Sequence, residues 1–504
     1  MSNILSILNC NLKIKISFLI IFFSGLGLRF FYFPYELPLV ADGMDYFTYA
    51  TEIVSLGHLP TEWTPINNGW SIFVSFWFSI LNLEYSFQYM QLQRILSIIL
   101  SSLITIPVYF LCKRFFDEKI SLVGAALFTF EPRILINSLL GITEPLFILL
   151  GISSLITFLK YDKKYTIISF TLASFCTIIR SEGLFLFFIL TILFIVKYKF
   201  SKEIIKTFLP CVGIFLLILM PIMSYRIEVT GYDGIFQRAS GETVRILSNS
   251  NYQVTNEIVA GLELFIKYLG WIMIPSFLVF VPLGIIQFLR KRTKETNFII
   301  IFLIVSSIPI LYAYFSQALD TRYFYVLYPI FCLLSLFAVE TYLVKLPRKN
   351  LMLSLMIIGI LITSVGFYEY EKIDYEKEQE LNKIAKIISN KELGLNFHPT
   401  FSRYIYANEL PTTWPFVIND VQFKTKIIPT SNFENLESFI ISSRTDLTHL
   451  IIDDNPNLPN FLQKVYNNEE KYEYLNEVYN SKDENFKHQM KLFKIDFQKL
   501  DSKK

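Results

Sequence analysis

Two carboxylates stand three residues apart in an otherwise apolar part of the chain. Asp42 and Asp45 lie in the run Ala-Asp-Gly-Met-Asp-Tyr-Phe-Thr-Tyr-Ala, directly after a long apolar stretch. If residues 45–55 form a helix, Asp42 lies at or near its N-terminus, where the helix dipole favours an ionised carboxylate. Such a carboxylate can accept a proton from an attacking hydroxyl, or it can bind a divalent cation together with Asp45. A plain helix cap is the structural alternative for Asp42.

The surrounding chain has the composition of a membrane protein. Of its 504 residues, 53% are hydrophobic and only 18% are charged, against about 25% in an average soluble domain. Residues 1–368 hold 28 basic and 21 acidic residues, whereas residues 369–504 hold 18 and 22 at higher charge density. We therefore expect a membrane domain over 1–368 and a water-soluble domain over 369–504. The composition excludes a disordered chain and a disulfide scaffold, and it does not indicate a nucleic-acid partner.

Apolar stretches predict the membrane crossings, since a helix needs about 20 apolar residues to span a bilayer. Two longer regions, 120–159 and 165–196, have lysine at both ends and should each cross twice. Their outward turns are expected at 131–144 and 180–183. With seven single stretches the total is eleven crossings, in a mainly α-helical bundle. The single stretches are 14–33, 91–111, 204–224, 264–288, 297–315, 323–344 and 351–368.

The remaining outer segments are expected to form two large loops. The first, residues 34–90, contains the short apolar segment 69–81, which we interpret as an interfacial or re-entrant helix. The second, residues 226–263, is rich in glycine, arginine and tyrosine, and we interpret it as a gating loop for donor or acceptor. The five cysteines fall in or beside apolar segments and are expected to be buried thiols.

The basic residues predict the orientation of this bundle. Nineteen of the 28 in residues 1–368 fall on the side of the N-terminus, which indicates an inner N-terminus and an outer C-terminus. Residues 369–504 should therefore be extracytoplasmic, in a multi-pass protein of the cell membrane. The nine basic residues on the outer side include eight arginines, and arginine is suited to bidentate binding of phosphate or carboxylate. They are Arg29, Arg94, Arg133, Arg180, Arg226, Arg238, Arg245, Lys267 and Arg322.

An arginine-lined outer rim indicates an anionic ligand there. The structural alternative for each arginine is an ion pair with an outer acid such as Glu131, Glu144 or Glu182. For Arg322, a local ion pair with Asp320 is the favoured interpretation.

Six short motifs occur in order along this outer side. They are Asp42…Tyr46…Ala50…Gly57 in the first loop, Gln93-Arg94, the small-residue span 122–132 with Glu131-Pro132, Thr143-Glu144, Arg180-Ser181-Glu182-Gly183, and Arg322-Tyr323 with Pro329. With these motifs in this order, the chain resembles the polyprenol-dependent membrane glycosyltransferases of the C-type (GT-C) superfamily. That superfamily includes protein O-mannosyltransferases and lipid A aminoarabinose transferases. The segment around 448–453 resembles archaeal members.

The resemblance implies a lipid-phosphate sugar donor and inversion at the anomeric carbon. Asp42 would be the general base, and Arg94, Arg180 and Arg322 would bind the donor phosphate. Supporting roles would fall to Asp45, Tyr46, Glu144 and Tyr323. Because a phosphate leaving group needs little acid assistance, one carboxylate could suffice. No cofactor is required by this reading, although a divalent cation at Asp42 and Asp45 is an option.

The chain also departs from the family pattern. Gly43 follows Asp42 where the mannosyltransferase motif has a second acid, so whether Asp45 replaces that acid stays open. A Trp-Trp-Asp-Tyr-Gly run is missing, which disfavours an oligosaccharyltransferase. The alternatives from other classes are a lipid-linked-sugar flippase or transporter, a polysaccharide polymerase and a non-catalytic scaffold.

The soluble domain is predicted to be a small α/β fold. Its sequence pattern predicts helices over 435–441, 458–466 and 469–478 and strands over 450–453 and 490–497. We expect it to recognise the acceptor or to cap the membrane domain.

Overall fold

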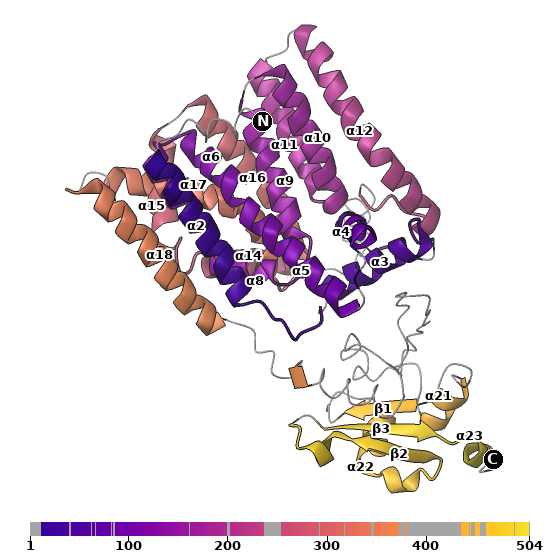
Figure 1. The fold of residues 1–504 in the computed structure, drawn as a ribbon. Coiled ribbons are helices and arrows are strands. Elements are labelled where there is room, and N and C mark those ends of the chain that lie inside the picture. The colour runs from indigo at the N-terminus through magenta and orange to yellow at the C-terminus, as the bar shows by residue number, and fades with distance from the viewer. Residues whose placement is uncertain are drawn as a thin grey trace. The chain divides into compact units, whose positions relative to one another are not determined.

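The structure is a computed structural model, shown in Figure 1. It describes residues 12–39, 42–61, 63–65, 67–81, 83, 86–160, 162–198, 202–235, 254–291, 293–316, 318–343, 347–371, 379–380, 435–442, 444, 449–453, 460–487 and 489–502. Most of the predicted gating loop, including Arg238 and Arg245, lies outside these residues, and so does Cys10.

The chain forms two compact units, each built from separate stretches of sequence. The first unit comprises Met1–Phe33, Thr61–Phe73 and Arg94–Lys372, and the second comprises Pro34–Pro60, Val74–Gln93 and Ile373–Lys504. The helices α4 (Gly69–Ile80) and α5 (Ser86–Leu103) therefore contribute residues to both units.

The first unit is helical throughout the part that the structure describes. Its other elements are α2 (Leu12–Phe31), α6 (Thr105–Lys113), α7 (Glu118–Thr129), α8 (Pro132–Ser138), α9 (Glu144–Phe158), α10 (Lys163–Ile179), α11 (Gly183–Tyr198), α12 (Lys202–Thr230), α14 (Val254–Ile272), α15 (Phe280–Arg290), α16 (Lys294–Phe315), η1 (Thr321–Leu327), α17 (Tyr328–Ala338), η2 (Val339–Leu343) and α18 (Lys349–Glu371). One large apolar core runs through this unit, and the free thiols of Cys112, Cys176, Cys211 and Cys332 are buried in it.

Six helices among the described residues are long and apolar enough to cross a membrane, and a bent pair, α7 with α8, would make a seventh. The six are Leu12–Phe31, Phe87–Lys113, Lys206–Thr230, Lys294–Phe315, Thr321–Tyr342 and Lys349–Glu371. Several other predicted crossings are shorter helices, such as α9 with 15 residues and α11 with 16. The prediction of a mainly helical, multi-pass architecture therefore stands, while the number of eleven crossings stays a prediction.

The two double-crossing regions break where the sequence predicted their turns. α7 and α8 meet at an angle of 53°, and Pro132 begins α8 because a proline at this position loses no helical hydrogen bond. α10 ends at Ile179, and α11 begins at Gly183. The functional motifs between 131 and 144 and between 180 and 183 therefore lie at helix ends.

The segment 264–288, predicted as one crossing, is covered by two helices rather than by one continuous helix. α14 ends at Ile272 and α15 begins at Phe280. Pro275 lies in the turn between them and has no N–H to donate to a continuous helix. α15 packs closely on α17, since a Cβ on Gly284 would lie 1.9 Å from the carbonyl oxygen of Leu334.

Three of the loops that the sequence assigned to the inner side are joined by polar contacts. Lys349 pairs with Asp117 at 2.7 Å, Arg114 pairs with Glu295 at 2.6 Å, and Lys119 donates to the Asn350 amide oxygen. The pKa of the Asp117 carboxyl lies below its ordinary value. Partial burial alone would raise this pKa, but hydrogen bonds from Lys349 and the Ile120 N–H stabilise the ionised carboxylate by more. These contacts bring residues 113–119, 293–295 and 349–350 to one end of the first unit.

The second unit contains α3 (Asp42–Leu56) and a small α/β part near the C-terminus. Phe47 of α3 packs edge to face on Phe78, and the Gln93 amide donates to the Gly43 carbonyl at 2.9 Å. Near the C-terminus, β1 (His449–Asp453), β2 (Leu475–Asn480) and β3 (Met490–Ile495) form an antiparallel sheet in the order β1-β3-β2 (Figure 1). The helices beside them in sequence are α21 (Leu436–Ser442), α22 (Asn460–Asn467) and α23 (Phe497–Ser502).

One predicted helix of this domain is wrong. Residues 469–478 form a short 3₁₀ turn, Glu469–Lys471, followed by most of strand β2. A register shift between Glu477 and Tyr479 interrupts the regular pairing of this strand with β3, and Leu475 and Tyr479 are its buried residues. The predicted elements at 435–441, 450–453, 458–466 and 490–497 are confirmed to within a few residues as α21, β1, α22 and β3.

Candidate functional site

The turn between α10 and α11 presents two charged side chains from the first unit. Arg180 leaves α10 in extended conformation, and Glu182 follows it in the turn. The turn closes tightly at Gly183, where an added Cβ would lie 2.5 Å from the Thr177 nitrogen. A glycine at this position therefore lets Arg180 and Glu182 project from the helix ends.

Arg180 is held by two carboxylates. Its Nη1 lies 2.5 Å from Glu144 Oε1 and donates to Thr143 Oγ1 at 3.2 Å, while its Nη2 lies 2.9 Å from Glu182 Oε1. Glu144 is the first residue of α9, so its charge also interacts favourably with the helix dipole. The planar guanidinium is thus fixed along both edges.

Arg322 approaches the same glutamate from η1. Its Nη1 lies 3.9 Å from Glu144 Oε1, and its Nε lies 2.5 Å from Asp320 Oδ2. The other oxygen of Asp320 accepts the Arg322 backbone N–H at 2.8 Å, so Asp320 caps η1. The predicted local ion pair between Asp320 and Arg322 is confirmed.

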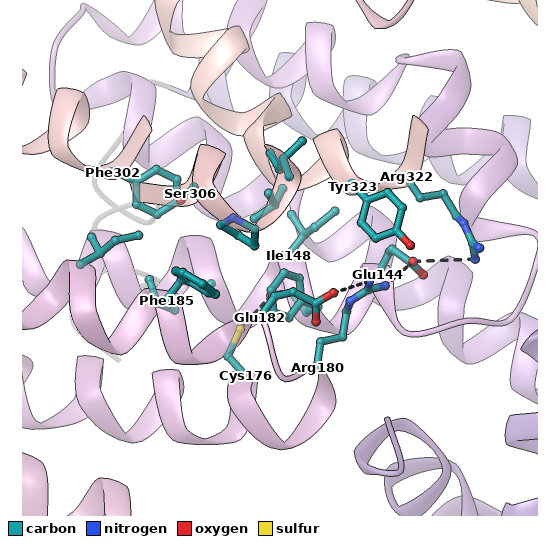
Figure 2. A pocket seen from close by; sticks show the side chains of 17 residues that line it. Glu144, Ile148, Cys176, Arg180, Glu182, Phe185, Phe302, Ser306, Arg322 and Tyr323 are labelled. Carbon is teal, nitrogen blue, oxygen red and sulfur yellow. Dashed lines mark hydrogen bonds and ion pairs between the residues drawn. The ribbon is translucent and has the colours of Figure 1, made fainter. Parts of the chain in front are cut away.

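These charges lie at one end of an apolar pocket (Figure 2). About 670 Å³ of space, part of it open, lies between α9, α10, α11, α16 and the η1 segment. Its polar lining comes from Glu144, Arg180, Glu182, Ser306, Arg322 and Tyr323. The rest is mainly apolar and includes Phe147, Ile148, Phe185, Leu186, Ile189, Phe302, Ile310 and Val326. A pocket with two arginines at its charged end and an otherwise apolar body fits an amphiphile with an anionic head.

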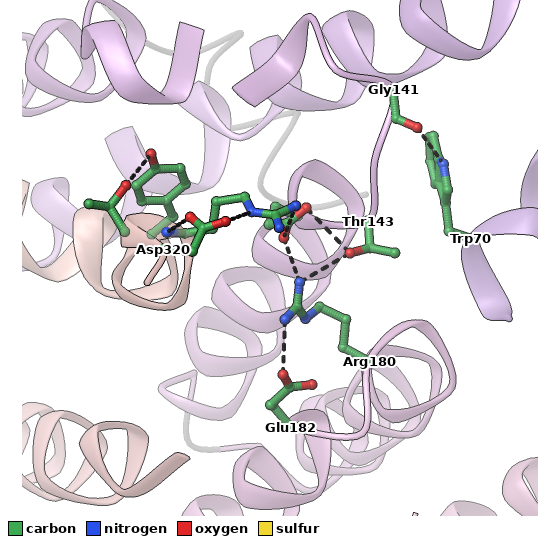
Figure 3. Close-up of polar contacts among 10 residues, drawn as sticks. Trp70, Gly141, Thr143, Arg180, Glu182 and Asp320 are labelled. Carbon is green, nitrogen blue, oxygen red and sulfur yellow. Dashed lines mark hydrogen bonds and ion pairs between the residues drawn. The ribbon is translucent and has the colours of Figure 1, made fainter. Parts of the chain in front are cut away.

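Trp70 supports the backbone next to this cluster (Figure 3). Its indole N–H donates to the Gly141 carbonyl at 2.9 Å, two residues before Thr143. The preceding Gly69 approaches α10 so closely that an added Cβ would lie 2.5 Å from the Ile178 carbonyl oxygen. The start of α4 therefore contacts both the 139–143 turn and the end of α10. Thr143 lies in this turn, and Arg180 follows α10, so α4 supports the two segments whose side chains meet.

Two other arginines that were predicted to lie on the outer side have structural partners. Arg133 is buried against Glu131 at 3.6 Å and Glu371 at 3.5 Å, donates to the Ile274 carbonyl, and lies over the rings of Trp271 and Phe367. Arg29 is buried and donates to the carbonyls of Gly25 and Thr129 and to Ser101 Oγ. The ion pair weighed as the structural alternative therefore describes Arg133, whereas Arg29 donates to neutral acceptors.

The predicted donor-phosphate residues are thus only partly brought together. Arg180 and Arg322 share Glu144 and line one pocket. Arg94 is buried, donates from Nε to the Leu139 carbonyl at 3.0 Å, and is not among the residues lining that pocket. Tyr323 lines the pocket beside Arg322, as a supporting residue should.

The predicted catalytic aspartate begins a helix, as expected. α3 starts at Asp42, whose side chain is partly exposed; Asp45 is exposed and Tyr46 is buried. These three residues belong to the second unit, whereas Arg94, Arg180 and Arg322 belong to the first. Among the described residues, no group of three or more His, Cys, Asp or Glu side chains is arranged to hold a metal ion.

The sequence did not single out the apolar wall of the pocket or Trp70. Phe185, Phe302 and Ile310 come from helices far apart in sequence, and each is one of many apolar residues at helical spacing. Trp70 had a weak signal, a tryptophan directly after a glycine at the start of an apolar helix.

Comparisons with known proteins identify the fold. No family model matches the chain, and no curated protein matches it by sequence. Solved structures do match it. The oligosaccharyltransferase of Archaeoglobus fulgidus, in complex with Zn and sulfate, aligns over 87% of this chain and 68% of its own, with a TM-score of 0.55 and 12% identity. The same archaeal protein, AglB, with an inhibitory peptide and a dolichol-phosphate, aligns over 88% and 69%, with a TM-score of 0.52 and 14% identity.

A bacterial structure covers almost the whole of both chains. ArnT from Cupriavidus metallidurans, bound to undecaprenyl phosphate, aligns over 96% of this chain and 97% of its own, with a TM-score of 0.55 and 9% identity. The chain therefore has the fold of GT-C membrane glycosyltransferases, as the motif resemblance indicated.

Proposed function

We propose that the chain is a membrane glycosyltransferase that moves a sugar from a polyprenyl phosphate donor to a hydroxyl of a protein, lipid or glycan acceptor. The observation that carries this proposal is the pocket whose charged end contains Arg180 and Arg322 and whose body is apolar. Proteins with this fold have been solved with dolichol-phosphate and with undecaprenyl phosphate. Both ligands combine the two chemical features that the pocket accommodates.

The donor would lie with its phosphate at the charged end and its isoprenoid chain along the apolar wall. Guanidinium groups bind phosphate oxygens through paired N–H bonds and stabilise the charge that grows on the leaving phosphate. Phe147, Phe185 and Phe302 would cover the first isoprene units. Arg94 stays a proposed donor residue on the strength of its motif.

Asp42 is the proposed general base. Its carboxylate would take the proton of the acceptor hydroxyl, whose oxygen attacks the anomeric carbon as the polyprenyl phosphate leaves. One displacement of this kind inverts the anomeric centre. Asp45 and Tyr46 would support Asp42 or the sugar, and a divalent cation, if used, would be bound by Asp42 and Asp45. By the distribution of basic residues, the reaction would take place on the extracytoplasmic side.

The test is transfer by the purified full-length chain. A polyprenyl-phosphate monosaccharide should release its sugar to an acceptor or to water, and Asp42→Asn should abolish release while donor binding persists. Glu52→Gln changes a carboxylate of the same helix and is the matched control, with release expected to be retained. Near-normal turnover by Asp42→Asn would show that Asp42 is not the base.

The same assay separates the alternative functions. Movement of the donor across a vesicle membrane without sugar release would identify a flippase or transporter. Absence of both sugar release and donor movement would favour a non-catalytic scaffold. Use of a diphosphate-linked glycan in place of the monosaccharide phosphate would identify a polymerase.

A further inference from the structure

The cluster of ion pairs around Arg180 and Arg322, at the charged end of the pocket, contains more acid than base. Two guanidiniums, those of Arg180 and Arg322, are paired with three carboxylates, those of Glu144, Glu182 and Asp320. With every group ionised, this cluster carries a net charge of −1, counting two positive and three negative groups. An incoming phosphate would add further negative charge, which is unfavourable unless one carboxylate withdraws.

The three carboxylates differ in how firmly they are held. The Glu144 side chain is only 5% exposed and contacts both arginines and Thr143. The Asp320 side chain is 35% exposed, but its second oxygen caps η1 by accepting the Arg322 N–H. The Glu182 side chain is 26% exposed, lies in a turn, and pairs with Arg180 through Nη2. Glu182 lines the pocket, whereas Asp320 is not among its lining residues.

We propose that Glu182 is a displaceable internal anion at the lipid-phosphate site. It occupies the Nη2 edge of Arg180 when the pocket is empty, and it moves into water when the phosphate of a polyprenyl phosphate binds that edge. One arginine–carboxylate pair is exchanged for one arginine–phosphate pair. The Nη1 edge keeps its contacts with Glu144 (Figure 2) and Thr143 (Figure 3), so the plane of the guanidinium stays fixed during the exchange.

This inference rests on the proposed function and adds a role for a residue that the sequence assigned only as an ion-pair partner. Because Glu182 competes with the lipid phosphate, it weakens binding and favours release of the phosphate-bearing product. Removal of its charge should therefore strengthen binding, which is the opposite of the usual result of deleting an ion-pair partner in a binding pocket.

The experiment measures binding of farnesyl phosphate to the purified full-length chain. Glu182→Gln should lower Kd about tenfold, the effect expected from losing a competitor equivalent to one charge-assisted hydrogen bond. The matched control is Glu118→Gln, because Glu118 also pairs with a basic residue, Lys113 at 2.6 Å, and its side chain is 29% exposed, close to the 26% of Glu182. This control should leave Kd within about twofold of the wild-type value.

Two further comparisons test the proposal if Glu182→Gln folds poorly: a second substitution at Glu182, and the same substitutions combined with Arg180→Gln. Glu182→Ala should also strengthen binding, and neither substitution should matter in an Arg180→Gln background, where the edge that Glu182 occupies has been removed. Farnesol, which has no phosphate, should not respond to any change at Glu182.

The outcomes separate the two proposals. The lipid-phosphate site stands if the wild-type chain binds farnesyl phosphate and Arg180→Gln weakens that binding. The proposed exchange is nevertheless overturned if folded Glu182 variants bind farnesyl phosphate no better than the wild-type chain. If the wild-type chain and every variant fail to bind farnesyl phosphate, the lipid-phosphate site is overturned, and the exchange with it.

Discussion

Glu144 Oε1 lies 2.5 Å from Arg180 Nη1, and this pair joins the start of α9 to the end of α10. The same oxygen lies 3.9 Å from Arg322, so a single carboxylate orients guanidiniums from two different parts of the chain. Glu144 therefore helps to orient both arginines at the pocket, together with Asp320 in the case of Arg322.

Replacement of Glu144 by glutamine should destabilise the chain and weaken donor binding. The carboxylate is nearly buried, and breaking a buried ion pair by removing one partner typically costs about 3–5 kcal/mol. Retention of hydrogen bonding by the amide should keep the loss toward the lower value. Thermal unfolding in detergent and the Kd for a polyprenyl phosphate measure the two effects, and an unchanged unfolding temperature would contradict the assigned role.

Trp70→Phe tests the support of the 139–143 turn. The substitution keeps an aromatic side chain but removes the N–H that donates to the Gly141 carbonyl, leaving a buried acceptor without this bond. The expected cost is about 1–3 kcal/mol. Because the turn leads to Thr143 and Glu144, the KM for donor should rise as well. A lower unfolding temperature with an unchanged KM would show that Trp70 supports the fold without positioning the site.

The sequence could predict the helix ends at which the charges lie. Lysines at both ends of 120–159 and 165–196 indicated outward turns, and the turns carry Glu144, Arg180 and Glu182. Local pattern also predicted a helix over 45–55 with Asp42 at or near its N-terminus, and the pairing of Asp320 with Arg322. Each of these features depends on residues close together in sequence.

What the sequence could not predict depends on packing between distant segments. The contact between Arg322 and Glu144 joins residues 178 positions apart, and no local signal distinguishes it from a pairing with another outer acid. Burial of Arg29 and Arg133 among helices removed two arginines from the predicted rim for the same reason. In the C-terminal domain, strand β2 is formed by its pairing with β3, a contact between separate segments that the local pattern of 469–478 did not indicate.

Gly183→Ala should disrupt the turn that presents Arg180 and Glu182. The added methyl would lie 2.5 Å from the Thr177 nitrogen, so the helix ends must move apart, at a cost of about 1–3 kcal/mol. The matched control is Gly359→Ala in α18, where an added Cβ meets nothing within 4 Å and alanine should stabilise the helix slightly. Unfolding temperatures of the two variants should therefore move in opposite directions. A shift of the same sign in both would contradict the tight turn.

Glu477→Gln should stabilise the C-terminal domain at neutral pH and have no effect in acid. Partial burial and the neighbouring Glu469 raise the pKa of the Glu477 carboxyl, although Asn480 and Lys491 act in the opposite direction. A raised pKa in the folded state means that the ionised form is disfavoured there, so the wild-type domain loses stability as pH rises through this pKa. Glutamine has no charge to disfavour, so the variant should keep its stability as the pH rises.

Amide hydrogen exchange of β2 and β3 in the full-length chain measures this effect, with variant and wild type compared at the same pH. The variant should exchange more slowly at about pH 7.5 and equally at about pH 3, which is more than one unit below the ordinary glutamate pKa of about 4.3, so that the wild-type carboxyl is almost fully protonated in both states. Equal exchange at both values would show that the charge of Glu477 is not disfavoured in the folded domain.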